Sequence, residues 1–320
     1  MDYVGKLFSG DLIYTSEFES LYPPLFIYII SIFSVFNISK WSIGLPILLC
    51  DFFTAIIVWK IVYKVWKNQL TASISFIIYL INPICLYYTD YLLLNTSVFT
   101  FFLVISIYFL LIKNYYYATL FLSLSVMCKQ FAIIFFPILL IFVIKNLKND
   151  KIITKEIIRK MGLIFLIFVI PIILLSMPYI FSSYPDFPNY LESLLNIDLP
   201  YGIYPPSRIY PVDFTVPFYV MGTNNSIFIA IKFFLNKYLF LFISNLIIII
   251  FYVFIDIDFN FNKNFLVITL IQFISMTIFF PRGMYKDYCV LFVPIMSIIT
   301  MEFLKRMGLE KWKKNPMYYI

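Results

Sequence analysis

The sequence predicts an all-α polytopic membrane protein, and three observations support this fold class. Hydrophobic residues make up 62% of the 320 residues and charged residues 13%, whereas roughly 25% of a soluble domain is charged. The mean hydropathy is +0.92. Long apolar runs such as residues 245–255 lack the alternation of a membrane β-barrel strand, so a helical bundle is the architecture that satisfies the backbone in lipid.

The N-terminal residues 1–42 predict an outer loop that leads into an interfacial helix. Pro23 and Pro24 cannot continue a helix, but they suit the first turn of one. We therefore expect a helix over residues 24–36, preceded by a non-helical segment that contains Glu17 and Glu19. Such a helix is about 20 Å long, against a hydrocarbon core of about 30 Å, so we expect it to lie in the membrane interface.

Nine apolar segments follow and predict about nine transmembrane helices, besides one or two interfacial helices on the outer face. They cover residues 43–63, 70–87, 93–112, 116–127, 131–144, 162–180, 238–257, 265–280 and 288–303. We expect a single membrane domain (1–320) with four parts. These are the outer loop with its proline helix (1–42), a first helix bundle module (43–180), a large outer loop with a surface helix at 226–236 (181–236), and the C-terminal helices with a basic cytoplasmic tail (237–320).

The basic residues predict how these helices are oriented. The net charge is +7, and one alternating assignment places sixteen of the 24 Lys and Arg residues on the cytoplasmic side, where insertion favours them. These are Lys60, Lys64, Lys67, Lys113, Lys145, Lys148, Lys151, Lys155, Arg159, Lys160, Lys263, Lys305, Arg306, Lys311, Lys313 and Lys314. The charge excess therefore reflects topology, and we expect no nucleic-acid partner. The remaining polar clusters then fall on the outer side: residues 2–19, 90–95, 129, 181–225 and 282–287.

The residue types that are present restrict the chemistry. The chain has no His, which removes the usual general base and the commonest metal ligand. Its four Cys residues stand singly, without the spacing of a metal site or a redox pair. Catalysis must therefore use carboxylates, Lys, Arg or Tyr. We expect no cofactor; a divalent metal stays open, but no pattern in the sequence supports one.

Several charged residues stand apart from the insertion pattern. Asp51 lies inside the first span and indicates either function or a structural Asp that is protonated or helix-paired; we favour the structural role because no cation stands one turn away. Lys129 interrupts an apolar stretch on the outer side, which favours anion binding over a lysine that only extends to the surface. Arg282 and Lys286 share this placement, and Arg and Lys are the usual phosphate ligands. The alternative for these two is a charged turn paired with Asp287.

The outer carboxylates are candidates for a general base, which needs only to reach an acceptor hydroxyl. They are Asp2, Asp11, Glu17, Glu19, Asp90, Asp186, Asp198 and Asp213.

The order of the motifs resembles that of a known enzyme family. Tyr22-Pro23-Pro24-Leu25 closes the first outer loop, and Asp51 follows within a span. The turn Tyr91-Leu92-Leu93-Leu94-Asn95 keeps only the Asn of a His-Phe-Gln-Tyr-Asn motif, Lys129-Gln130 precedes a proline-containing helix, and residues 282–288 form a late outer turn. Together they are similar to the GT-C superfamily of polyprenyl-phosphate-sugar-dependent glycosyltransferases, above all the dolichyl-phosphate-mannose and dolichyl-phosphate-glucose users.

This resemblance implies an inverting hexosyltransferase. Its donor would be a polyprenyl-phosphate-linked monosaccharide and its acceptor a lipid-linked molecule or another glycoconjugate, with the active site on the non-cytoplasmic face. The membrane would be the cell membrane in a prokaryote and the endoplasmic reticulum in a eukaryote. An Asp of the first outer loop is the base in the family, which implies Asp2 here, with Asp11, Glu17 and Glu19 as alternatives. The implied substrate-binding residues are Tyr22, Asp90, Asn95, Lys129, Gln130, Arg208, Arg282 and Lys286.

Two other hypotheses stay open at this point. The first transmembrane helix of the family is not found before Asp2, which is expected of an inactive, truncated paralogue or of a chain whose base lies upstream of Met1. The second hypothesis is a lipid or solute transporter, or a flippase. A transporter predicts internal symmetry and paired broken helices, which the sequence does not contain.

Overall fold

The computed structural model describes residues 2–9, 14–15, 18–19, 23–180, 208–209, 242–258, 260–279 and 284–306. Within these ranges the chain is almost entirely helical, and the strands are limited to two short antiparallel pairs. The all-α fold class predicted from the composition is therefore confirmed.

The proline helix forms where the sequence predicts it. α2 (Pro24–Ser34) begins at Pro24 and ends two residues before the predicted boundary. Upstream lies α1 (Asp2–Ser9), a short helix that the sequence pattern does not predict, and then β1 (Tyr14–Thr15), which pairs with β2 (Phe18–Glu19). The Tyr28 hydroxyl of α2 lies 3.2 Å from the Tyr179 hydroxyl in α9 (Thr154–Ile180). This hydrogen bond fixes the proline helix against the end of a long helix.

All nine predicted segments contain helix in the part of the chain that the structure describes. Besides α9 they are α3 (Lys40–Trp66), α4 (Gln69–Leu80) with α5 (Pro83–Cys85) and the π-helix η1 (Leu86–Tyr91), α6 (Thr96–Leu111), α7 (Tyr115–Cys128), the 3₁₀-helix η2 (Gln130–Ile134) with α8 (Phe135–Asn149), the helix Phe242–Phe254, α13 (Phe261–Phe279), and the 3₁₀-helix η3 (Lys286–Leu291) with α14 (Phe292–Arg306).

Length separates these helices into two groups. Among the described residues, four helical stretches are long and apolar enough to cross a membrane: Lys40–Trp66, Gln69–Tyr91, Gln130–Asn149 and Thr154–Tyr179. Five apolar helices are shorter, with 10–17 residues each, and α2 is one of them. The predicted surface helix at 226–236 and the basic tail beyond residue 306 lie outside the described residues.

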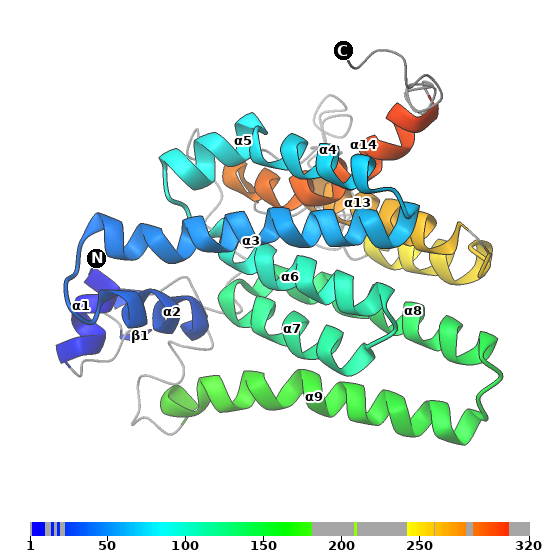
Figure 1. Ribbon diagram of the computed structural model, residues 1–320. Coiled ribbons are helices and arrows are strands. Elements are labelled where there is room, and N and C mark those ends of the chain that lie inside the picture. Colours follow the sequence, from blue (N-terminus) through cyan, green and yellow to red (C-terminus); the bar gives the residue numbers. More distant parts are fainter. Residues whose placement is uncertain are drawn as a thin grey trace, which may run out of the picture.

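Serine side chains connect the helices inside the bundle. Four buried hydroxyls donate to a backbone carbonyl of a neighbouring helix: Ser97 to Ile47 (3.2 Å), Ser106 to Ala118 (2.7 Å), Ser123 to Phe168 (2.8 Å) and Ser125 to Phe99 (2.7 Å). Small polar residues let helix backbones approach closely in lipid, where apolar side chains gain little from mutual contact. α3, α6, α7 and α9 accordingly lie side by side (Figure 1).

Phenylalanine rings join the C-terminal helices to α8. The ring centroid of Phe142 in α8 lies 4.5 Å from that of Phe265 and 5.0 Å from that of Phe261, both in α13. Phe251 of the helix Phe242–Phe254 lies 6.1 Å from each of these two rings. Offset and tilted aromatic pairs at such distances add about 0.5–1.5 kcal/mol each beyond the burial of their surface. The cluster packs the last helices against α8.

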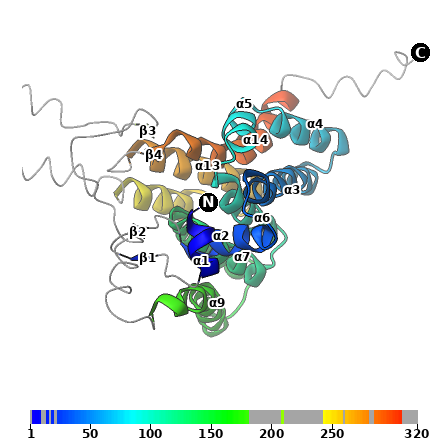
Figure 2. The ribbon, with the colours of Figure 1, turned by 90° about the vertical axis from the view of Figure 1, so that its left-hand side faces the viewer.

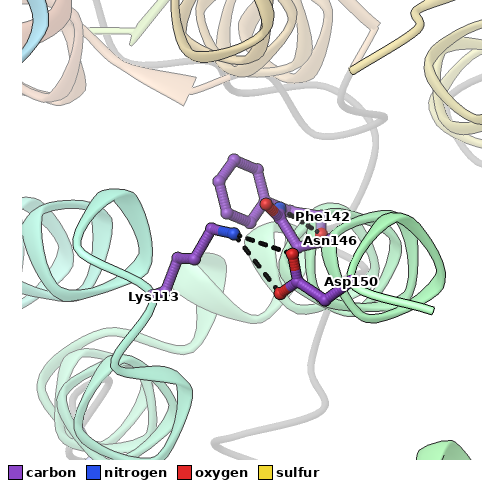
Figure 3. Close-up of polar contacts among 4 residues, drawn as sticks. All are labelled: Lys113, Phe142, Asn146 and Asp150. Atoms are coloured by element: carbon purple, nitrogen blue, oxygen red, sulfur yellow. Dashed lines mark hydrogen bonds and ion pairs between the residues drawn. The ribbon is translucent and has the colours of Figure 1, made fainter. Parts of the chain in front are cut away.

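The turns at one end of the bundle contain the lysines that the sequence places in the cytoplasm. Lys113, between α6 and α7, pairs with Asp150 after α8 at 3.2 Å, and Figure 3 shows its amino group reaching both carboxylate oxygens. Lys263 of α13 lies 5.7 Å from the ring centroid of Trp66, the last residue of α3. We call this end, on the right of Figure 1, the basic end; the opposite end, where α1 and α2 lie, is called the site end.

Three turns of the basic end have a lysine in left-handed backbone geometry. Lys67, Lys113 and Lys151 have φ values of 56°, 61° and 54°. After Lys113 the amide of Asn114 bonds back to the carbonyl of Phe109 at 2.9 Å, so the helix ends in a Schellman motif. Glycine is the usual residue at this position because it has no Cβ to clash.

Candidate functional site

Three irregular helical segments meet at the site end. η1 follows the break that Pro83 makes after α4, η2 separates α7 from α8, and η3 precedes α14. η3 contacts η1, α5 and α6. Figure 2 looks onto this end of the bundle. Irregular backbone at membrane depth is tolerated where it is buried in protein or lines a cavity, and π-helices occur frequently at functional sites. We therefore assign the candidate functional site to this end of the bundle.

Lys129 is the most buried cation of the described residues. Its side chain is 5% exposed, and its amino group lies 4.3 Å from the ring centroid of Tyr288, itself 4% exposed. The Phe131 ring meets Tyr288 edge-on at 5.1 Å. The position follows from the backbone, because α7 ends at Cys128 and Lys129 adopts extended geometry (φ −157°, ψ 119°) before η2 begins. The break turns the lysine inward.

Buried polar atoms that lack a hydrogen-bond partner among the described residues accompany Lys129. They are Asn95 Nδ2, Gln130 Oε1 and Thr89 Oγ1. Asn95 precedes α6, and the bond from Ser125 to Phe99 sets the start of α6 beside the end of α7, where Lys129 follows. An unsatisfied buried polar atom costs about 1–3 kcal/mol, so such atoms indicate a bound water or ligand. Three of the predicted binding residues, Asn95, Lys129 and Gln130, are thus in neighbouring elements.

A short strand pair positions the backbone of two further predicted cations, Arg208 and Lys286, at the same end. β3 (Arg208–Ile209) pairs with β4 (Met284–Tyr285), with Arg208 opposite Tyr285. Lys286 follows directly, at the start of the segment that also contains Tyr288. At Arg208 and Lys286 the structure describes the backbone only, and Arg282 lies outside the described residues.

The remaining predicted site residues are described unevenly. Asp90 is exposed on η1, which contacts η3. Asp2 in α1 and Glu19 in β2 are described by their backbone only. The others lie outside the described residues: Asp11, Glu17 and Tyr22. The elements α1, β1, β2 and α2 face the viewer in Figure 2, so these four elements lie at the site end.

The structure adds two tyrosines that reasoning from the sequence missed. Tyr288 was noted only as part of the late outer turn, yet it provides the ring beneath Lys129. Tyr79 donates a 2.7 Å hydrogen bond to Asp51 Oδ1, and both side chains are buried. The sequence pattern considers only partners one turn away on the same helix, whereas the partner of Asp51 is 28 residues away on α4. Asp51 is thus paired between helices, in line with the structural role favoured above.

A family model and two solved structures match the chain. Residues 22–175 match the family described as dolichyl-phosphate-mannose-protein mannosyltransferase. The structure of ArnT from Cupriavidus metallidurans in the apo state matches with a TM-score of 0.59 and 15% identity, over 98% of this chain and 55% of that one. ArnT bound to undecaprenyl phosphate matches with a TM-score of 0.57 and 14% identity, over 98% and 56%. No curated protein matches by sequence.

These matches confirm the resemblance that the motif order indicates. The chain is an integral membrane protein with the fold of the GT-C glycosyltransferases. It spans a little over half the length of the two ArnT structures.

Proposed function

From this GT-C fold we propose that the protein is a membrane glycosyltransferase that uses a polyprenyl-phosphate-linked sugar. The family matched by residues 22–175 is named for a dolichyl-phosphate-linked donor, and one of the two matching ArnT structures holds undecaprenyl phosphate. Both molecules are polyprenyl phosphates. The transferred sugar is proposed to be a hexose and the acceptor a lipid-linked molecule or another glycoconjugate.

The observation that supports this proposal best is the burial of Lys129 at the site end. An ammonium group excluded from water interacts strongly with a charge that develops nearby, because no solvent screens it. The leaving group of the proposed reaction is a polyprenyl phosphate, whose negative charge grows as the bond to the sugar breaks. Lys129 is 5% exposed and lies against Tyr288, so it is held in place before the donor arrives. Asn95 and Gln130 offer unsatisfied amide atoms to the donor in the same region.

The acceptor is activated by a carboxylate in this proposal. Asp2 is the first candidate, with Asp11, Glu17 and Glu19 as alternatives; the described elements of this segment, α1, β1 and β2, lie at the site end, which supports the choice. The carboxylate takes the proton of the acceptor hydroxyl as the oxygen attacks the anomeric carbon, and the phosphate leaves from the opposite face. The configuration at the anomeric carbon is therefore inverted. Lys129, with Arg208, Arg282 and Lys286, compensates the charge on the phosphate.

Sidedness follows from the lysines of the basic end. Inserted proteins keep such residues in the cytoplasm, so the site end would face the opposite compartment. This is the compartment in which we propose that transfer occurs.

A transfer assay tests the proposal. Membranes that contain the full chain are incubated with radiolabelled polyprenyl-phosphate hexose and lipid acceptors, and the label that moves to an acceptor is measured. The four carboxylates are then replaced one at a time: Asp2→Asn, Asp11→Asn, Glu17→Gln and Glu19→Gln. Loss of a general base costs about 10²–10⁴-fold, so one variant is expected to fall by that factor and the other three by far less. Transfer that needs a nucleotide sugar in place of the polyprenyl-phosphate sugar would contradict the proposal.

A further inference from the structure

The basic end contains a second polar hollow, far from the candidate site along the bundle. A cavity of about 480 Å³ lies between the end of α8 and the end of the helix Phe242–Phe254. Its lining is Lys145, Lys148, Asn149, Tyr252, Asp256 and Ile257. The cavity is shallow and broadly open to its surroundings, and nothing in the proposed transfer reaction uses it.

Two lysines of this cavity are oriented by the same neighbouring helix. Lys148 Nζ donates to the Tyr252 hydroxyl oxygen at 2.9 Å, and Lys145 Nζ donates to the carbonyl oxygen of Ile255. Their amino groups lie 5.4 Å and 5.8 Å from the Tyr252 ring centroid, so two positive charges lie close to one tyrosine. Neither forms an ion pair among the described residues, where the two ion pairs are Lys113 with Asp150 and Arg159 with Glu156.

The hydrogen bonds already formed leave donors for a ligand. A lysine has three N–H groups, and each of these two uses one on the neighbouring helix. The Tyr252 hydroxyl accepts from Lys148, so its own proton is available, and the Asn149 amide adds two more donors. A group with several oxygen acceptors fits this lining.

The charge of the lining selects among such groups. Lys145 and Lys148 contribute +2 and Asp256 contributes −1, which leaves +1. A single positive charge suits the one negative charge of a phosphodiester better than the two of a phosphomonoester. The carboxylate of Asp256 also opposes the entry of a more highly charged anion.

The position of the cavity indicates where the phosphodiester comes from. The cavity lies where two apolar helices end, and lysines and tyrosines gather at the level of lipid headgroups. We propose that the cavity binds the phosphodiester of an anionic phospholipid headgroup in the leaflet at the basic end. The lipid would join α8 to the helix Phe242–Phe254 through its phosphate. Free phosphate offers the same chemistry, and the experiment separates the two sources.

Binding of a short-chain lipid tests this proposal on the full chain. The purified protein in detergent is titrated with dioctanoyl-phosphatidylglycerol, and native mass spectrometry measures the dissociation constant. Lys145→Gln with Lys148→Gln is expected to weaken binding at least about tenfold, since each lysine near a headgroup contributes on the order of 1 kcal/mol. Lys64→Gln with Lys155→Gln removes the same charge from exposed positions at the same end, and its dissociation constant should stay within about twofold of the unaltered protein.

Two further arms complete the test. Asp256→Asn removes the repulsive carboxylate, so it should tighten binding of the lipid, a result that a misfolded variant would not give. Inorganic phosphate at the same concentration should not displace the lipid; displacement would mean a site for free phosphate and would overturn the lipid assignment. Equal weakening by both lysine pairs, or binding that does not saturate, would overturn the site itself.

Discussion

The two ends of the bundle place their cations in opposite environments. At the basic end the Lys113 side chain is 52% exposed and pairs with Asp150, which is 41% exposed. At the site end Lys129 is 5% exposed and lies over an aromatic ring. An exposed pair contributes little to stability, whereas burying an ammonium costs several kcal/mol unless it is compensated.

This difference separates exposed lysines, which we expect to orient the chain, from a buried lysine, which we propose to bind the donor. To orient the chain in the membrane, a lysine needs only to lie near the end of a helix, where it stays in water. A lysine that the fold removes from water, as Lys129 is, stands outside this pattern, and we propose that it binds the donor. Residue type alone does not separate these two kinds of cation among the 24 Lys and Arg residues. Burial separates them wherever the structure describes the side chain.

The largest effect is expected from exchanging Lys129. Lys129→Met keeps an unbranched side chain only one atom shorter but removes the charge that would stabilise the phosphate leaving group. Loss of one such electrostatic contact costs about 10²–10³-fold, and we expect transfer to fall by that factor while the protein keeps its melting temperature. Lys113→Met makes the same exchange at the basic end and should leave transfer within about twofold. Equal losses in the two variants would break the contrast between the ends.

The second largest effect is expected from removing the hydrogen bond between Tyr79 and Asp51, and it should lower the free energy of unfolding. Tyr79→Phe leaves the buried carboxyl of Asp51 without its 2.7 Å donor, and an unsatisfied buried group costs about 1–3 kcal/mol. The free energy of unfolding in detergent measures this loss. Tyr28→Phe is the matched control, because its 3.2 Å bond to Tyr179 is only partly buried, and it should cost less. The interpretation fails if both variants unfold at the same denaturant concentration.

The smallest effect is expected at the basic end itself. A double-mutant cycle with Lys113→Ala and Asp150→Ala should give a coupling energy of about 0.2–1 kcal/mol, as for other exposed pairs. Added salt should reduce this energy further, because exposed charges are screened. A coupling above about 2 kcal/mol that resists salt would show that Lys113 is less solvated than its exposure indicates.

Much of the fold could be predicted because lipid restricts the choices. Apolar length identified the nine helical segments that follow the proline helix, and the missing N–H of Pro24 fixed the start of α2. The alternation of lysines correctly placed residues as distant as Trp66 and Lys263 at one end. α1 was missed because its eight residues are amphipathic and too short for the hydropathy pattern of a span.

The candidate site could be predicted only in part, because its contacts join distant segments. Lys129 was identified by its position in an apolar stretch, which is a local signal. Tyr288 lies 159 residues further on, and no pattern in the sequence links it to Lys129. Asp51 and Tyr79 are 28 residues apart, and no pattern in the sequence links this pair either. Pairing between helices depends on packing, which the order of residues does not reveal.

The left-handed lysines of the basic end show two requirements acting on the same residue. At Lys67, Lys113 and Lys151 the backbone favours glycine, and a side chain there costs about 1 kcal/mol. Glycine, however, would remove a positive charge from turns that we expect to orient the chain during insertion. On this hypothesis the sequence accepts strain in the finished fold in exchange for correct assembly. Replacing these turns by glycine to stabilise the protein would risk producing molecules that are inserted in the wrong direction.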